Sequence, residues 1–167
     1  IAYVSSTNQN GDIDIIDLNT WQVSGSIEGV GGHSLALSPQ GNYLYAVNTV
    51  NDTLSIANLA TRQLVTSLHV GDGPKEIALS PEGAIAYVIN SYGRIAAAID
   101  LTTYRLLGIA AVGDNLLNDM ILSPDGKVAY ILDTKELIIV DTATIRKIAP
   151  TFVTSRNILL DLVLSSD

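Results

Sequence analysis

One stretch of about fourteen residues recurs along the chain. It occurs as LALSPQGNYLYAVN at 35–48, as IALSPEGAIAYVIN at 77–90 and as MILSPDGKVAYILD at 120–133. The serine that ends the apolar run returns at intervals of 42, 43 and 42 residues, at Ser38, Ser80, Ser123 and Ser165. A fixed period in the forties is typical of a repeat architecture. We therefore divide the 167 residues into four units, roughly 1–37, 38–79, 80–122 and 123–167.

Each unit contains four short apolar or alternating runs rather than a helical stripe. In the second unit these runs are LALS, YLYAVN, DTLSIANL and QLVTSLHV, separated by Gly, Asn, Asp and Pro. Such runs, rich in Val, Ile, Leu, Thr and Tyr, are typical of β-strands. Four strands per unit with tight turns predict an all-β fold, a β-propeller built of four-stranded antiparallel blades of about 42 residues.

Two recurring motifs are interpreted as turns rather than as functional sites. In Ser-Pro-x-Gly, proline sets φ and glycine takes a positive φ, which suits the hairpin between the first and second strands. In the Asx/Thr motif, a side-chain oxygen can accept hydrogen bonds from the backbone of its own turn. We place this motif between the third and fourth strands, at Asp17, Asn58, Asp100 and Asp141.

Several of these segments together resemble a known repeat. AYVS at 2–5, YAVN at 45–48, AYVIN at 86–90, SPDG at 123–126 and IIVDTAT at 138–144 resemble the YVTN-type β-propeller repeat. The resemblance covers all four units. It implies an exported protein, whether secreted, periplasmic or at the cell surface, and a relation to the lactonase-type seven-bladed propellers.

The chain starts and stops at the same point of the repeat unit. It begins in a second strand, IAYV, and ends just after a first strand, LDLVLSS. A closing propeller shares one blade between its two ends, and an open array leaves unpaired edges. The four units could close as a four-bladed ring, but we favour part or half of a larger propeller, partnered by further blades, by another protein or by a second copy in a homodimer.

Composition excludes several classes of partner. The net charge is −8 and no Lys/Arg cluster occurs, so the basic stripe that nucleic-acid binding requires is missing. Apolar runs such as LIIV at 137–140 are too short for a membrane span, so no membrane insertion is expected. With no cysteine in the chain, thiolate metal sites and a cysteine nucleophile are ruled out.

The candidate binding residues follow from aligning the units on the repeated serine. This alignment places Ser34, Glu76, Asp119 and Asp161 at equivalent positions, and His33, Lys75 and Asn118 one position earlier. In propellers this position lies at the channel mouth, where ligands usually bind. We predict a binding surface formed by His33, Lys75, Glu76, Asn118, Asp119 and Asp161.

The three carboxylates of this set also suggest a metal site. Oxygen ligands converging on an axis could hold Ca²⁺, with Glu76, Asp119 and Asp161 as its ligands. The alternative, which we favour, is a solvated acidic rim that caps turn amides.

Two functions remain open at this point. The first is a non-catalytic scaffold for protein or ligand binding that needs no cofactor. The second is a lactonase-like propeller hydrolase that uses a divalent cation at the channel mouth, with His33, Glu76 and Asp119 as the candidate constellation. No motif assigns a catalytic residue, so we favour the scaffold.

Overall fold

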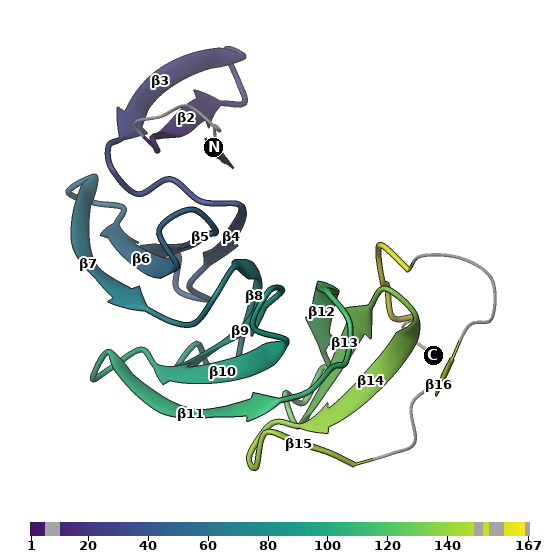
Figure 1. The fold of residues 1–167 in the computed structure, drawn as a ribbon. Helices are drawn as coiled ribbons and strands as arrows, with labels where there is room; N and C mark the ends of the chain where they lie inside the picture. Colours follow the sequence, from purple (N-terminus) through teal and green to yellow (C-terminus); the bar gives the residue numbers. More distant parts are fainter. Residues whose placement is uncertain (6–10, 149–151, 154–158, 166–167) are drawn as a thin grey trace.

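The computed structural model describes residues 1–5, 11–148, 152–153 and 159–165. Within these ranges the chain forms four antiparallel sheets and no helix (Figure 1). The sheets stand side by side as the blades of an open arc. The predicted all-β architecture of four-stranded antiparallel blades is therefore confirmed.

The strands follow the chain order within each sheet. The first blade contains β1 (Ala2–Ser5), β2 (Ile13–Asp17) and β3 (Gln22–Ile27). The second blade contains β4 (Ser34–Leu37), β5 (Tyr43–Asn48), β6 (Thr53–Asn58) and β7 (Gln63–His69). The third blade contains β8 (Pro74–Leu79), β9 (Ile85–Asn90), β10 (Ile95–Asp100) and β11 (Arg105–Ala111). The fourth blade contains β12 (Leu117–Leu122), β13 (Val128–Asp133), β14 (Glu136–Asp141) and β15 (Arg146–Lys147), and β16 (Phe152–Val153) also pairs with β14.

The end of the chain differs from the prediction. The segment LDLVLSS was expected to form a first strand, but residues 159–165 form no strand. A strand needs a neighbouring backbone edge that offers successive hydrogen bonds. This segment instead bonds the side chains of β12, since the Leu159 carbonyl accepts from Asn118 and the Leu162 amide donates to Asp119. At the other end of the chain the predicted second strand does form, as β1, which is the edge of a three-stranded sheet.

The cores lie between blades rather than inside them. Strands β5, β6, β9 and β10 are buried along most of their length, whereas β7 and β11 on the outer rim are largely exposed. One cluster joins the first and second blades, with Ile13, Ile15, Ile27, Val30, Leu44, Ala46 and Ala57. A second joins the second and third blades around Val47, Leu54, Ile56, Val88 and Ile99, and a third joins the third and fourth around Ile89, Leu117, Ile131, Ile138 and Val140. Each blade therefore depends on its neighbour for burial.

The Ser-Pro-x-Gly motif forms the predicted hairpin, and its serine has a further role. The amide of Gly41 donates to the carbonyl of Ser38 at 2.8 Å, and the equivalent bonds recur in the next two blades. The hydroxyl oxygen of Ser38 accepts from the amide of Tyr43 at 3.0 Å. The hydroxyls of Ser80 and Ser123 accept in the same way at 3.0 Å. The serine side chain thus closes the hairpin that the proline begins.

The hairpin also packs against the preceding blade. A Cβ atom on Gly83 would lie 2.5 Å from Cδ of Pro39, and a Cβ atom on Gly126 would lie 2.5 Å from Cδ of Pro81. A Cβ atom on Gly41 would meet nothing within 4 Å. All three glycines have φ between +70° and +75°. The motif therefore sets the approach of successive blades as well as the turn.

The Asx turns between the third and fourth strands are confirmed. The Oδ1 atoms of Asp17, Asn58, Asp100 and Asp141 each accept a backbone amide at 2.7 to 2.9 Å. The Thr102 hydroxyl, together with the amides of Thr103 and Thr102, lowers the pKa of Asp100 to about 2. Each turn ends on a residue with left-handed φ between 54° and 57°, namely Trp21, Arg62, Tyr104 and Ile145.

The packing of the hairpin predicts different costs for two equivalent substitutions. Gly41→Ala should cost only the left-handed backbone conformation, about 1 to 2 kcal/mol. Gly83→Ala should cost the same plus the overlap with Pro39, about 1 to 3 kcal/mol more. Urea unfolding of the two variants measures the difference. Equal losses of stability would show that the blades do not pack through this turn.

Candidate functional site

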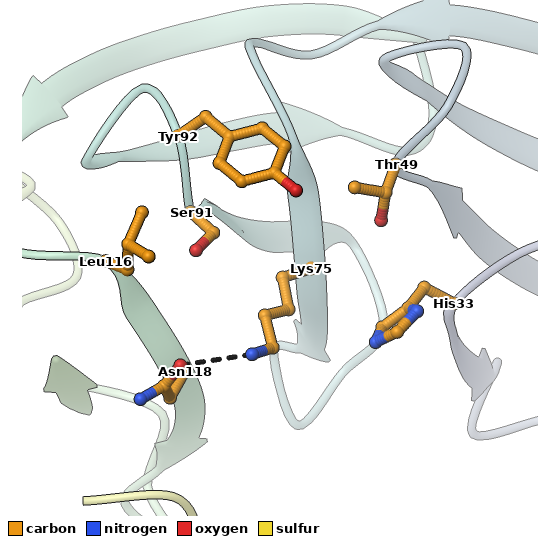
Figure 2. Close-up of a pocket in the computed structure, with 7 residues that line it drawn as sticks. All are labelled: His33, Thr49, Lys75, Ser91, Tyr92, Leu116 and Asn118. Carbon is orange, nitrogen blue, oxygen red and sulfur yellow. Dashed lines mark hydrogen bonds between the residues drawn. The ribbon is translucent and has the colours of Figure 1, made fainter. Parts of the chain in front are cut away.

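A pocket of about 260 Å³ lies between the second, third and fourth blades (Figure 2). It forms where the inner strands begin and where the second strands run into their hairpins. Its lining residues come from three successive blades and are His33, Thr49, Lys75, Ser91, Tyr92, Leu116 and Asn118. We call it the channel-mouth pocket.

A bulge at the start of β8 and of β12 turns a side chain of each strand into this pocket. In β8, Pro74 lies opposite Asn90 and Glu76 lies opposite Ile89, which leaves Lys75 as the extra residue. The same shift in β12 leaves Asn118 as the extra residue. Because a bulge redirects the side chain of its extra residue, both side chains reach the pocket. Lys75 Nζ donates to Asn118 Oδ1 at 3.1 Å (Figure 2).

The structure divides the predicted binding set in two. His33, Lys75 and Asn118 line the channel-mouth pocket, whereas Glu76, Asp119 and Asp161 are not among its lining residues. These three carboxylates instead form contacts along the inner strands, as described next. The prediction that all six residues share one binding surface has no direct test.

The carboxylates connect neighbouring inner strands through hydrogen bonds. Ser34 Oγ donates to Oε1 of Glu76, which joins β4 to β8. The amide of Leu162 donates to Oδ2 of Asp119 at 2.7 Å and to Oδ1 of Asp161 at 2.8 Å. Asp119 and Asp161 thus accept backbone amides, as expected for carboxylates that cap amides rather than bind a metal.

Burial disfavours the charged form of two of these groups. Burial raises the pKa of Glu76, although the bonds from Ser34 and the Ile77 amide oppose that rise, and Asp119 raises it slightly further. Burial also raises the pKa of Asp119, against bonds from the Leu162 and Met120 amides.

The calcium hypothesis gains no support from this geometry. Within the described parts of the chain, no three His, Cys, Asp or Glu residues are grouped so that they could hold a metal ion. The prediction that Glu76, Asp119 and Asp161 bind Ca²⁺ therefore rests on the repeat alignment alone.

Sequence reasoning missed the hairpin residues Thr49, Ser91 and Tyr92, and Leu116 directly before β12. A signal was present, because Thr49 and Ser91 each follow an asparagine that ends a second strand, Asn48 or Asn90. Asn48 Oδ1 accepts the Val50 amide at 2.9 Å and so forms the turn.

Asn90 departs from this pattern. Its Nδ2 donates to the Val70 carbonyl at 3.1 Å, while its buried Oδ1 has no partner among the described groups. The hairpin that carries Tyr92 is held instead by the Ser91 amide, which donates to the Gly73 carbonyl at 2.8 Å. Tyr92 therefore lies over the pocket in a hairpin that differs from its neighbours.

Comparison with known proteins supports the fold. No family model and no curated protein matches the chain. Among solved structures, hydrazine synthase of Kuenenia stuttgartiensis matches with a TM-score of 0.79 and 25% identity, over 86% of this chain and 43% of that one. The Cps50 (Swd1) β-propeller domain of Myceliophteria thermophila matches with a TM-score of 0.80 and 17% identity, over 98% of this chain and 55% of that one.

These matches define the class of protein. The chain is a β-propeller array, and it spans about half the length of the two solved chains. Membership of the YVTN-type repeat family is not shown, because no family model matches. Among the described residues, no helix has the length and apolar character to cross a membrane.

The burial of Glu76 predicts a pH-dependent stability. The pKa of Glu76 in the folded state lies above the ordinary value of 4.5, because burial favours the protonated form. The contribution of protonated Glu76 to the free energy of unfolding is therefore fully present below about pH 4.5 and is lost as pH rises through the folded-state pKa. Glu76→Gln keeps an oxygen for Ser34 and removes this dependence. The variant should gain stability over the wild type as pH rises from 4 to 7.

Thermal unfolding at several pH values measures this difference. Glu82→Gln, at an exposed hairpin position, controls for the change in net charge. A Glu76→Gln variant whose stability follows that of the wild type at every pH would contradict the effect of burial.

Proposed function

We propose that the chain is a non-catalytic β-propeller scaffold that binds a protein or ligand at the channel-mouth pocket. One observation carries this proposal. Residues from three blades converge on a pocket that contains a lysine with no carboxylate partner among the described residues. Blades hold such loops rigidly, and loops on a rigid frame are the usual place for binding residues.

The charge of Lys75 indicates what the pocket binds. Among the described residues, the salt bridge found joins Lys127 to Asp125 at 3.4 Å. Both residues belong to a hairpin turn, and neither lines the pocket. Lys75 contacts the neutral amide of Asn118, so its positive charge is not compensated by that partner. An anionic group, above all a carboxylate, is the ligand chemistry that complements it.

The size of the pocket limits the ligand. Drug-sized molecules occupy pockets of about 300 to 1,000 Å³, and this pocket has about 260 Å³. It suits one acidic side chain of a protein partner or a small carboxylate. Tyr92 and Leu116 offer apolar contact beside the polar groups.

We also propose that the protein is exported or displayed at the cell surface. This proposal rests on the resemblance to the YVTN-type repeat. Fractionation of the source organism with an antibody against the chain tests it, and recovery in the cytosol alone would contradict it.

Substitution of Lys75 tests the binding proposal. In ¹H–¹⁵N NMR titrations with acetate and with N-acetyl-aspartate amide, the amides of Thr49, Ser91 and Tyr92 should shift. Lys75→Gln should weaken binding about tenfold, which corresponds to about 1.4 kcal/mol for one charged hydrogen bond.

Lys127→Gln is the matched control, because it removes the same charge from an exposed turn. It should bind both probes as the wild type does. Binding that survives in Lys75→Gln, or shifts spread over the whole surface, would contradict the proposal.

The lactonase-like hydrolase remains a second candidate because of one observation. Burial raises the pKa of Glu76, and a raised pKa suits a general base at neutral pH. An assay against a panel of lactones, with and without Ca²⁺, tests this candidate. No turnover above the buffer rate, or turnover that is unchanged in Glu76→Gln and Asp119→Ala, would exclude it.

A further inference from the structure

Three side chains of the channel-mouth pocket meet at one short segment of the chain. The Ser91 amide donates to the Gly73 carbonyl at 2.8 Å, and Thr49 Oγ1 donates to the Pro74 carbonyl at 2.7 Å. Lys75 follows directly in the sequence. Ser91 and Thr49 come from the hairpins of two different blades, and both therefore lie beside the start of the Lys75 side chain (Figure 2).

The hydroxyl of Ser91 is a donor that the protein itself does not use. It has no hydrogen-bond partner among the described residues. Ser91 is 6% exposed, and Figure 2 shows its oxygen pointing into the space that the labelled side chains surround. Because an unpaired polar group in a buried place is costly, this hydroxyl favours a ligand that bonds to it.

Lys75 offers further donors to the same ligand. Its Nζ atom bonds to Asn118 and keeps two more protons, because an ammonium group has three. Lys75 and Ser91 together can therefore bind the oxygens of one carboxylate through hydrogen bonds, one of them assisted by charge.

Thr49 offers the opposite chemistry, a hydrogen-bond acceptor. Its hydroxyl proton is used in the bond to the Pro74 carbonyl, so only the lone pairs of Oγ1 are left for a ligand. An acceptor beside two donors suits a ligand that has an N–H group close to its carboxylate.

The N–H group that fits is a neutral amide rather than an ammonium. No carboxylate is among the residues that line the pocket, so a second positive charge would have no partner there. An ammonium group would also be repelled by Lys75.

Apolar surface lies next to these polar groups. Tyr92 is 60% exposed and Leu116 is 44% exposed, and both line the pocket (Figure 2). The Tyr92 ring packs against the backbone, since a Cβ atom on Gly73 would lie 2.4 Å from its Cδ2 atom. An apolar side chain beside the carboxylate of a ligand would cover this surface.

We propose that the channel-mouth pocket binds the C-terminus of a peptide whose last residue is apolar. This inference rests on the proposed binding function and names its ligand. The terminal carboxylate bonds to Lys75 and Ser91, and the adjoining amide N–H donates to Thr49. The last side chain packs on Tyr92 and Leu116. Capture of a terminal carboxylate is one of the recurring modes of peptide recognition.

Other carboxylates match only part of the pocket. The side chain of an aspartate or glutamate has neither an amide N–H nor an apolar group on the carbon next to its carboxylate. A free amino acid has an ammonium group in place of the amide. A peptide C-terminus therefore complements more of the lining than either of them.

Dissociation constants of four small probes test each feature separately. N-acetyl-L-leucine has all three features. N-acetyl-L-leucinamide lacks the carboxylate and should bind at least about tenfold more weakly, because it loses a charged hydrogen bond. L-leucine has an ammonium group and N-acetylglycine has no side chain, and each should bind about tenfold more weakly. ¹H–¹⁵N NMR titrations followed at the Ser91 and Tyr92 amides measure all four constants.

Substitution of Thr49 tests the contact that separates a peptide from a simple carboxylate. The reference probe is 4-methylpentanoate, which has the carboxylate and side chain of leucine but no N–H. Thr49→Val should weaken N-acetyl-L-leucine about fivefold more than it weakens this probe. Thr49→Ser keeps the hydroxyl and should retain the preference. Thr61→Val, at an exposed turn outside the pocket, is the matched control and should bind as the wild type does.

The outcomes distinguish this inference from the function on which it rests. Tighter binding of N-acetyl-L-leucine than of 4-methylpentanoate, with a preference that Thr49→Val removes, supports it. Equal binding of these two probes, equal binding of N-acetyl-L-leucine and its amide, tighter binding of L-leucine, or a preference that survives in Thr49→Val would overturn it. If acetate and N-acetyl-aspartate amide still bind through Lys75, the carboxylate site stands and only the peptide C-terminus is excluded. If no probe binds, both proposals fail.

Discussion

Burial between neighbouring blades is the constraint on which the rest of the structure depends. In the described parts of the chain every apolar cluster joins two blades, and residues such as Ile13, Val88 and Ile138 pack in clusters shared with a neighbouring blade. The repeated hairpin serves this stacking, since the turns of the third and fourth blades present Gly83 and Gly126 to the proline of the blade before. Loss of any one blade would therefore expose the core that it shares with its neighbour.

The sequence predicted the fold well because every element that forms a blade recurs. The turn prolines indicate the hairpin between the first and second strands, the Asx residues indicate the one between the third and fourth, and both recur with the same period. The structure has strands on either side of these turns. The predicted last strand did not form, because a strand depends on an edge that its own sequence cannot supply. The left-handed residues that end the Asx turns, such as Trp21 and Arg62, could not be predicted either, since glycine is the usual choice there.

The candidate site was predicted only in part, for two physical reasons. Lys75 and Glu76 are neighbours in sequence, yet a bulge turns only Lys75 into the pocket, and a bulge leaves no mark in the residue pattern. Tyr92 occurs in one blade alone, so the repeat gave no hint of it. The binding proposal rests on such residues, because repeated residues build the frame while unrepeated ones distinguish a ligand.

The account of the frame rests on burial between neighbouring blades, and amide hydrogen exchange in the central strands tests it most directly. If each blade depends on its neighbours, the amides of β5, β6, β9 and β10 should exchange slowly and at similar rates, because they open together. Exchange that is much faster in the central strands of one blade than in those of the next would show that the blades are stable separately, which would contradict the account.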